Sequence, residues 1–327
     1  MKKKLLIIGF GSIGKRHAKI FSKHNLDIFI LTKQNITQFK KVNKLSETKN
    51  INPDYFLLCS PTSSHYQELS YIEKNFKKKT ILVEKPLFHK FHPLIIKNNK
   101  VVVGYNLRHH PILQSIKEKI KAKKIISIYV RCLSSLKDWR QNKNLKNSYS
   151  VDKKRGGGVL LDLSHELDYI QWIFGKISKI NFSQVKKITN ITKNSEDYVN
   201  VQGNIDKINF VLNLNYFSKI EKRDILIDGQ NFNLYGDLIK NELTFSNKKK
   251  KFFKKFNFNN NDTYEVQADL FLKKIFKNFC SYKNGNKINI ISMEHLYLIG
   301  FQGISYCDHF LLYLDVLDLK EPTFLRV

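Results

Sequence analysis

A glycine pattern near the start of the 327-residue chain has the spacing G-x-G-x-x-G. An apolar run at residues 5–8 precedes it, and a stretch with helical periodicity at residues 15–24 follows it. In such a strand-loop-helix context the first glycine permits a tight turn, the second lets the backbone approach a pyrophosphate, and the third allows close helix packing. Free N–H groups at the helix start favour phosphates. The pattern predicts a dinucleotide-binding loop, with an ordinary glycine-rich turn as the alternative; its members are Gly9, Phe10, Gly11, Ser12, Ile13 and Gly14.

The residues after the second expected strand, residues 28–31, bear on which dinucleotide is bound. A carboxylate at this place would hydrogen-bond the adenosine ribose of NAD. The chain has Thr32 and Lys33 instead, so no carboxylate repels a 2′-phosphate and a cation is available to attract one. We therefore expect NADP in preference to NAD. The alternative is that both side chains are simply exposed in a loop.

Polar residues also follow two further expected strands, residues 55–59 and 81–84. The first is followed by Ser60, Pro61, Thr62 and His65, and the second ends at Glu84 and is followed by Lys85. An ammonium at such a strand end would favour the alkoxide-like charge that develops when a hydroxyl or carbonyl carbon exchanges a hydride. Lys85 could otherwise be one of many surface lysines, and His65 could cap or pack locally at a helix start.

A second group of polar residues follows the glycine triplet at residues 156–158. Asp162, His165 and Asp168 repeat at three-residue spacing, so on one continuous helix His165 would lie beside both aspartates. A histidine suits proton transfer because its ordinary pKa is near neutrality, and a neighbouring carboxylate would orient its ring. The alternative is a helix-packing histidine whose polar atoms are satisfied by Asp168.

Five segments in this order resemble the Gfo/Idh/MocA family of dehydrogenases, and the likeness spans nearly the whole chain. They are GFGSIGKRHA at 9–18, CSPTSSH at 59–65, EKP at 84–86, GYNLRHHP at 104–111 and GGGVLLDLSHELD at 156–168. The resemblance implies a Rossmann domain followed by an α/β domain with a large open sheet that commonly mediates contacts between copies. It places the active site between the two domains.

The resemblance also implies roles for individual residues. Lys85 would contact nicotinamide and substrate, and Lys85, His165 and Asp162 would be the catalytic residues. In the family pattern the aspartate and histidine are commonly four residues apart, whereas here they are three apart, so which aspartate faces the substrate stays open. The residues expected beside the cofactor, in addition to the glycine loop, are Thr32, Lys33, Ser60, Pro61, Thr62, His65, Glu84, Lys85 and Asn106.

Substrate residues are expected at the junction of the two domains. Arg108 matches a family position near nicotinamide and substrate, although it could instead pair with a carboxylate between the domains, and Asp168 is the second aspartate of the helix. Trp139 and Arg140 belong to a loop that offers an aromatic face and cations, which suit a sugar or an anion. By analogy, this loop resembles that of members associated with surface-polysaccharide gene clusters.

These residues require a framework of two α/β domains. Expected strands and helices alternate over the first 110 residues, which predicts a doubly wound parallel sheet, with strands at 5–8, 28–31, 55–59, 81–84 and 101–105 and helices at 15–24 and 64–75. After a helix at 112–121, consecutive strands joined by polar turns predict a mostly antiparallel sheet, followed by helices near 264–279 and 292–312. We therefore assign residues 1–111 to an NAD(P)-binding Rossmann domain and residues 112–327 to a domain for substrate binding and oligomer contacts.

Composition limits the alternatives. The net charge of +29 raises a nucleic-acid role, but Lys, Asn, Ile and Phe are abundant throughout, as A/T-rich coding would produce, and no specific nucleic-acid partner is expected. No apolar stretch is long enough to span a membrane, so we expect a cytoplasmic protein. The four cysteines lie apart and predict neither a metal site nor a redox pair; they are Cys59, Cys132, Cys280 and Cys307.

The sequence thus predicts an oxidoreductase that transfers a hydride between NAD(P) and a CH–OH or C=O carbon. The expected substrate is a sugar, sugar acid or nucleotide sugar, of the kind found in surface-polysaccharide biosynthesis, and the expected assembly is a homodimer or homotetramer. The alternative from another class is a regulator that binds NAD(P) without turnover, because the same fold serves both.

Overall fold

The computed structural model describes residues 2–90, 92, 94–139, 145, 148–282 and 286–287. Arg140, Cys307, the side chain of Trp139 and the helix expected at 292–312 lie outside this described part. Within it, no helix is long and apolar enough to cross a membrane.

The first sheet has seven strands. They are β1 (Lys3–Ile8), β2 (Leu26–Leu31), β3 (Lys40–Val42), β4 (Tyr55–Leu58), β5 (Thr80–Glu84), β7 (Lys100–Gly104) and β16 (Cys280–Tyr282). Their order is β16-β7-β5-β4-β1-β2-β3, and all neighbours are parallel except β16, which runs antiparallel to β7. The chain therefore reverses its direction of winding between β1 and β4, where loops at the carboxyl ends of the strands diverge and leave room for a ligand.

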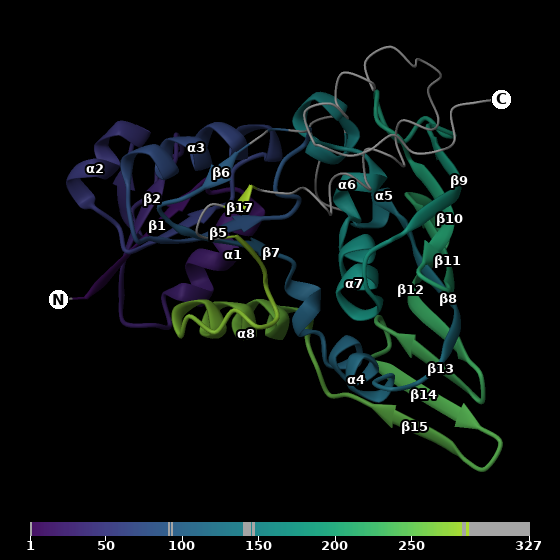
Figure 1. Cartoon of the computed structure of the whole chain (residues 1–327). Coiled ribbons are helices and arrows are strands. Elements are labelled where there is room, and N and C mark those ends of the chain that lie inside the picture. Colours follow the sequence, from purple (N-terminus) through teal and green to yellow (C-terminus); the bar gives the residue numbers. More distant parts are fainter. Residues whose placement is uncertain are drawn as a thin grey trace.

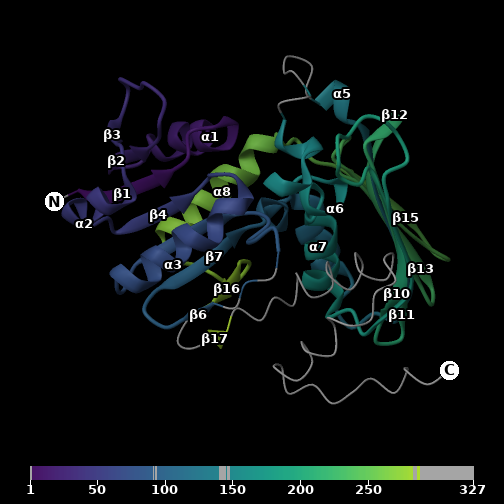
Figure 2. The same ribbon diagram turned by 90° about the horizontal axis from the view of Figure 1, so that it is seen from above.

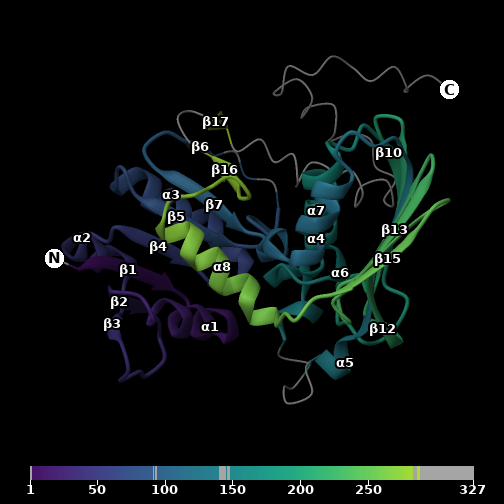
Figure 3. The same ribbon diagram turned by 90° about the horizontal axis from the view of Figure 1, so that it is seen from below.

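Helices cover both faces of this sheet. Helix α1 (Ser12–Phe21) and helix α8 (Asn260–Leu272) lie on one face and α3 (His65–Asn75) lies on the other (Figures 1 and 3). Alternate residues of β1 belong to separate buried clusters, Leu5 and Ile7 with the α1–α8 side and Leu6 and Ile8 with the α3 side. The short elements of this half are η1 (Leu45–Glu47), α2 (Thr48–Ile51), η2 (Thr62–Ser64) and η3 (Asn106–His109).

The connection from β5 to β7 departs from the usual crossover helix. Its described residues form only the two-residue strand β6 (Ile95–Ile96), which pairs with β17 (Asn286–Lys287). The buried carboxylate of Glu73 in α3 anchors the end of this connection, because it accepts hydrogen bonds from the backbone N–H groups of Lys97 and Asn98 at 2.7 and 2.6 Å. The carboxylate of Glu73 thus fixes the turn between β6 and β7, where a crossover helix is usual.

The second sheet has eight strands in the order β15-β14-β13-β12-β8-β11-β10-β9. Only β8 and β11 run parallel to each other, as the register shows. The strands are β8 (Ile125–Ser135), β9 (Lys179–Lys186), β10 (Tyr198–Ile205), β11 (Ile208–Asn215), β12 (Phe217–Gly229), β13 (Phe232–Asp237), β14 (Glu242–Asn247) and β15 (Lys251–Lys255). The sheet is therefore mostly antiparallel, as the sequence predicts.

A helical layer separates the second sheet from the first half of the molecule. Helices α6 (Val159–Asp162) and α7 (His165–Phe174) lie between the two sheets (Figures 1 and 2), and α4 (Pro111–Lys119) lies in the same layer (Figures 1 and 3). The other face of the second sheet carries no helix in the described part. The remaining short elements are α5 (Leu136–Trp139), η5 (Tyr149–Val151) and η6 (Lys153–Arg155).

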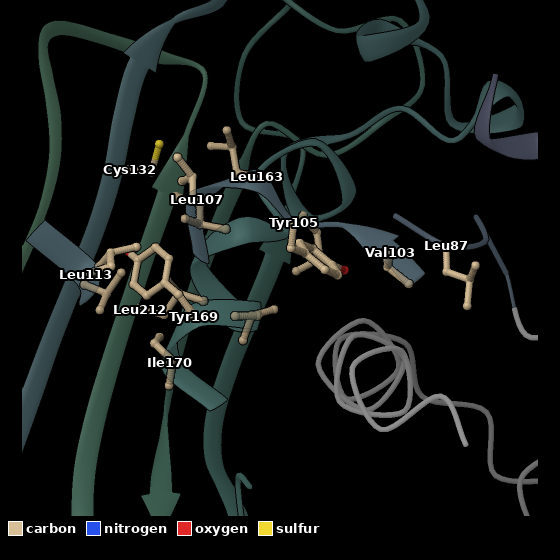
Figure 4. Close-up of a cluster of buried hydrophobic side chains, with 14 of the residues drawn as sticks. Leu87, Val103, Tyr105, Leu107, Leu113, Cys132, Leu163, Tyr169, Ile170 and Leu212 are labelled. Carbon is tan, nitrogen blue, oxygen red and sulfur yellow. The ribbon is translucent and has the colours of Figure 1, made fainter. Parts of the chain in front are cut away.

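One buried apolar cluster runs through both halves. Figure 4 shows Leu87 and Val103 of the first half, Tyr105 at the junction, and Tyr169 of α7 and Leu212 of β11 in this cluster. Because protein interiors pack densely, a shared core limits movement between the loops of the first sheet and the helices on the second. The residues expected to do chemistry lie on those loops and helices.

The predicted fold class is confirmed, with two corrections to its helices. The helix expected through residues 159–168 is wrong: the backbone of Leu163 (φ −98°, ψ 29°) separates α6 from α7. The helix expected at 264–279 instead begins at Asn260 and ends at Leu272. Helix α8 and strand β16, which follow the second sheet in the sequence, pack with the first sheet.

Candidate active site

The glycine loop joins β1 to α1 at the point where the winding reverses. Gly9 has φ +94°, and a Cβ there would lie 2.6 Å from the backbone nitrogen of Ser60. A Cβ on Gly14 would lie 2.2 Å from the carbonyl oxygen of Gly9. The packing of the loop against β4 and α1 therefore requires glycine at both positions.

Gly11 differs from its two neighbours because a Cβ there would meet no atom within 4 Å. The protein's own packing does not require glycine at this position, whereas a pyrophosphate lying against the backbone would. Gly11 is also the N-cap residue of α1 and gives the helix no side-chain cap, so the first N–H groups of α1 can donate to an anion. The loop fits the diphosphate of a dinucleotide, and Phe10, Ser12 and Ile13 complete it.

The end of β2 is tied to the glycine loop by a residue that the sequence did not single out. The side-chain amide of Gln34 donates to the carbonyl oxygen of Phe10 at 3.1 Å, and its backbone N–H donates to the hydroxyl of Thr32 at 3.1 Å. Lys33, between them, is exposed. The loop that would face the adenosine ribose therefore has a fixed turn and a cation, and no carboxylate at residues 32–35.

The side chain of His65 contacts the backbone of the loop after β4. Its Nδ1 lies 3.1 Å from the carbonyl oxygen of Leu87 and its Nε2 lies 3.0 Å from that of Ser60. Burial lowers the pKa of His65, while the carbonyl oxygens of Leu87 and Ser60 oppose this shift. The ring lies between these two carbonyls, one in the loop after β5 and one in the loop after β4. This geometry fits the local packing role that the sequence left open for His65. Thr62 is buried close to Gly156, where a Cβ would lie 3.0 Å from the Cβ of Thr62, and Pro61 precedes it in the same loop.

Lys85 and Asp162 bring the two halves together. The ammonium of Lys85 donates to the carbonyl oxygen of Asp162 at 2.5 Å and lies 3.5 Å from its carboxylate oxygen Oδ1. The carboxylate also accepts hydroxyl hydrogen bonds from Tyr149, Ser150 and Tyr216 at 2.5, 2.7 and 2.8 Å. Burial acts to raise the pKa of Asp162, but Lys85 and the three hydroxyls outweigh it and hold the pKa below its ordinary value. Asp162 is therefore an ionised partner of Lys85.

His165 is the first residue of α7 and lies against the edge of the Tyr105 ring, with ring centroids 5.7 Å apart. Burial lowers its pKa well below the ordinary value, and the charges of Lys85 and Arg223 lower it further. Its Nδ1 is buried without a hydrogen-bond partner among the described residues. The ring is therefore a neutral imidazole, able to accept a proton.

The expected support of His165 by a carboxylate is wrong. The break between α6 and α7 lets Asp162 turn toward its three hydroxyl partners, while Asp168 pairs with Arg108 through two hydrogen bonds of 2.8 and 2.6 Å. Aromatic packing by Tyr105, rather than an aspartate, holds the ring. Asp162 is thus the aspartate beside Lys85, and Asp168 is engaged between η3 and α7.

Two further residues expected beside a cofactor have partners within the chain. The side-chain amide of Asn106 donates to the hydroxyl of Thr263 in α8 at 2.7 Å. The carboxylate of Glu84 lies 2.6 Å from Nε2 of His17 in α1, and both side chains are buried. Of the loop that includes Trp139, the backbone of α5 is described and begins directly after β8.

The structure adds residues that the sequence did not identify as part of the site. Tyr216 follows β11 and reaches Asp162 from a position 54 residues later, and His17 reaches Glu84 across 67 residues. No local spacing connects such pairs. The glycine pattern predicted a helix after the loop. It did not indicate that His17 in this helix would contact Glu84.

Comparison with known protein families identifies both halves. Residues 3–94 match the family model described as "Oxidoreductase family, NAD-binding Rossmann fold", and residues 117–224 match "Oxidoreductase family, C-terminal alpha/beta domain". Together the two matches cover more than half of the chain. No curated protein sequence matches the chain significantly.

Solved structures share the fold over nearly the whole length. An NAD-binding oxidoreductase from Klebsiella pneumoniae superposes with a TM-score of 0.75 at 15% identity, covering 93% of this chain and 97% of its own. A UDP-N-acetylglucosamine 3-dehydrogenase from Acidithiobacillus ferrooxidans gives 0.69 at 14% identity, with 93% and 97% covered. A levoglucosan dehydrogenase in complex with NADH gives 0.72 at 13% identity, with 92% and 95% covered. The chain belongs to the Gfo/Idh/MocA family of oxidoreductases, with an NAD-binding Rossmann domain and the C-terminal α/β domain of that family.

Proposed function

We propose that this protein transfers a hydride between NAD(P) and a CH–OH or C=O carbon of a sugar, sugar acid or nucleotide sugar. The observation that carries the proposal is the position of Lys85. Its ammonium stands at the carboxyl end of β5, in the sheet that holds the glycine loop, and meets Asp162 of the second half directly. A cation held at this place would stabilise the negative charge that develops on the reacting hydroxyl or carbonyl oxygen.

The chain's own residues divide the proton chemistry between them. The nicotinamide would supply or accept the hydride at carbon. His165, a neutral imidazole, accepts the hydroxyl proton, and Lys85 stabilises the negative charge that develops on the oxygen. Asp162 does not exchange this proton, because three hydroxyls and Lys85 keep it ionised; its charge holds the ammonium in place. In the reverse direction the protonated imidazole returns its proton to the oxygen.

The substrate class rests on two kinds of support. The names of structural neighbours include a nucleotide-sugar dehydrogenase and a dehydrogenase of the anhydrosugar levoglucosan. In the second half, the hydroxyl of Tyr149 donates to Asp162. Helix α5, which includes Trp139, begins at Leu136, whose backbone N–H donates to the carbonyl oxygen of Tyr216, another partner of Asp162. We assign dinucleotide binding to residues 1–111 and substrate binding to residues from 112 onward. We further propose that the protein acts in surface-polysaccharide biosynthesis.

For the cofactor we propose NADP in preference to NAD. The turn after β2 has a neutral Thr32 hydroxyl, an exposed Lys33 and no carboxylate, so a 2′-phosphate would meet a cation and no repelling charge. Ser60 and Asn106 would lie near the bound dinucleotide, since both stand at carboxyl ends of strands in the same sheet.

The open face of the second sheet is the proposed contact between copies in a homodimer or homotetramer. It presents Tyr129 and Phe182, whose exposed fractions are 43% and 40%. Within the described residues no helix covers this face, and apolar side chains of this size exposed there favour burial against another surface.

The test begins with the purified protein. Calorimetry measures the binding of NADP⁺ and NAD⁺, and absorbance of the reduced nicotinamide then follows turnover with sugars, sugar acids and nucleotide sugars. We expect Lys85→Ala to lower kcat by about 100-fold or more while cofactor affinity stays within about threefold, because the lost charge acts on the reacting oxygen. Lys79→Ala, at the amino end of the same strand, is the matched control and should keep full turnover.

Two outcomes contradict the proposal. Folded protein that binds neither dinucleotide would remove the cofactor site, and full turnover by Lys85→Ala would remove this lysine from the mechanism. Tight cofactor binding without turnover on any of the three substrate classes would instead favour a regulatory protein of the same fold.

A further inference from the structure

His17 and Glu84 form a buried pair on the side of β5 that faces α1 and α8. His17 Nε2 lies 2.6 Å from Glu84 Oε1, and the two residues are 0% and 7% exposed. Removing both groups from water is costly unless the geometry is good, and losing either partner leaves the other buried without compensation. A pair this deep and this short is therefore a strong constraint on the two elements that it joins.

Those two elements carry the two parts of the proposed site. His17 lies three residues after Gly14 on α1, the helix that begins at the glycine loop. Glu84 is the last residue of β5 and directly precedes Lys85. The pair therefore connects the backbone that would bind the phosphates to the backbone that carries the ammonium.

Gly104 and Tyr264 pack on opposite partners of the pair. A Cβ on Gly104 of β7 would lie 3.1 Å from Glu84 Oε1, so glycine at this strand end makes room for the carboxylate. On the other side the ring of Tyr264 in α8 contacts His17 edge-on, with ring centroids 5.5 Å apart. The guanidinium of Arg16 in turn lies 4.9 Å from the centre of the Tyr264 ring. Three elements thus fix the imidazole and carboxylate in one arrangement.

We propose that His17 and Glu84 are positioning residues, which set the place of Lys85 relative to the glycine loop without themselves contacting the reacting atoms. This inference rests on the proposed hydride transfer, in which Lys85 must meet an oxygen beside the nicotinamide. It also changes the role of Glu84 from contact with the cofactor to control of the neighbouring lysine. A displacement of about 1 Å at a reacting group can lower turnover about 100-fold, so a small relaxation here would be measurable.

The first test measures the lysine itself and does not depend on turnover. The Lys85 side chain is 15% exposed and its amine donates to the carbonyl oxygen of Asp162, so reductive methylation by formaldehyde and a borane reductant should be slow in the wild type. We expect Glu84→Ala and His17→Ala each to speed Lys85 methylation several-fold, measured by peptide mass spectrometry. Glu84→Gln keeps the shape and a hydrogen bond to His17, and should restore most of the wild-type rate.

Glu73→Ala is the matched control. Glu73 is also a buried carboxylate of the first half, but it binds the turn after β6 on the α3 side of the sheet. We expect this variant to unfold at a lower temperature while leaving the Lys85 methylation rate unchanged. A loss of stability alone is thereby separated from a movement of Lys85.

Kinetics provides the second readout. In Glu84→Ala and His17→Ala we expect kcat to fall about 10- to 100-fold with the Kd for NADP⁺ within about threefold, and the double variant to be no slower than either single one, because the two residues act as a unit. Methylation that stays at the wild-type rate in both single variants overturns the positioning role. A large loss of NADP⁺ affinity with unchanged kcat also overturns it, since Glu84 would then serve the cofactor. A wild type without turnover overturns the proposed function, while the methylation result still decides the role of the pair.

Discussion

At the residue scale, two buried ionisable groups of the site have opposite charge states. His165 and Asp162 are both buried, yet the histidine loses its charge and the aspartate keeps it. The difference comes from their partners, because Asp162 has Lys85 and three hydroxyls whereas His165 has an aromatic edge and nearby positive charges. The site at neutral pH therefore contains one proton acceptor beside an ion pair. Proton transfer and charge stabilisation can thus be carried by different residues.

Glu68 gives a prediction for the pH dependence of stability. Burial raises its pKa from 4.5 to about 7, although the Ser60 hydroxyl, 2.6 Å away, opposes this. A raised pKa means that the folded state binds the proton more tightly; this stability is fully present below pH 4.5 and is lost as the pH rises through about 7. We expect Glu68→Gln to match the wild type at low pH and to exceed its free energy of unfolding by about 3 kcal/mol at pH 8.

Urea denaturation at pH 4.5 and pH 8 measures this difference. The exposed Glu47, whose carboxylate accepts from the backbone N–H of Asn43, supplies the control Glu47→Gln, which should show no gain at the higher pH. Equal stability of Glu68→Gln and the wild type at pH 8 would contradict the argument.

The turn after β2 supports a second prediction at this scale, for cofactor preference. In Thr32→Asp a carboxylate would face the ribose, where it repels a 2′-phosphate and accepts hydrogen bonds from a free ribose. We expect the ratio of NADP⁺ to NAD⁺ affinity, measured by calorimetry, to fall about tenfold or more. The exposed Asn35 offers the control Asn35→Asp, which adds the same charge farther along the loop. An unchanged ratio in Thr32→Asp would show that this side chain does not face the ribose.

Whether a site contact can be predicted from the sequence depends on how close the two partners lie along the chain. The glycine loop was predictable because all three glycines lie within one hexapeptide, and Gly14 packs against Gly9 of the same loop. The contact of Gly9 with Ser60, about 50 residues away, was not visible in this pattern. Glu84 was predicted to contact the cofactor, but its partner His17 lies 67 residues away. For Arg108 the sequence left open a substrate contact or a carboxylate between the domains, and it did not identify Asp168, 60 residues away, as that carboxylate. Nothing in local spacing indicates a partner at such a distance.

At the element scale, apolar runs located five strands of the first sheet, β1, β2, β4, β5 and β7. Other strands depend on pairing with neighbours that are distant in sequence. The short strand β3 follows from its contact with β2, since its sequence KKV has almost no apolar pattern. Likewise β16 joins the first sheet by pairing with β7, which the residue order cannot reveal. The break after Asp162 has a comparable origin, because the hydroxyls that hold this side chain come from other elements.

The connection between β5 and β7 leads to a prediction at this scale. Glu73 accepts from two backbone N–H groups and from the side chain of Asn99 at 2.8 Å, and so replaces much of the hydrogen bonding that a crossover helix would supply. Glu73→Ala removes the acceptor of two partly buried backbone donors and of the buried Asn99 side chain, at a cost of about 1–3 kcal/mol for each donor that cannot reach water. We expect a total loss of about 3 kcal/mol in urea denaturation. A loss below about 0.5 kcal/mol, the range of ordinary surface changes, would mean that other contacts hold the turn.

At the scale of the whole molecule, the two sheets are held by apolar packing and by polar contacts together. The buried cluster passes from the first half through Tyr105 to α7 and the second sheet (Figure 4). Across the same junction Lys85 contacts Asp162 and Arg108 contacts Asp168. A site assembled from both halves therefore depends on their relative position, which several independent contacts fix.

The Arg108–Asp168 pair tests this dependence. Its side chains are 12% and 3% exposed, so removal of one partner leaves a buried charge without compensation. We expect Arg108→Ala and Asp168→Ala each to lower the free energy of unfolding by about 3–5 kcal/mol, and the apolar double variant Arg108→Met/Asp168→Leu to lose much less than the sum. Urea denaturation of the four proteins gives the coupling energy directly, and the KM of the double variant separates the two roles that the sequence left open. If Arg108 joins the halves, the double variant keeps the wild-type KM; if Arg108 binds substrate, its KM rises sharply although the fold is restored, because no replacement for the guanidinium is present.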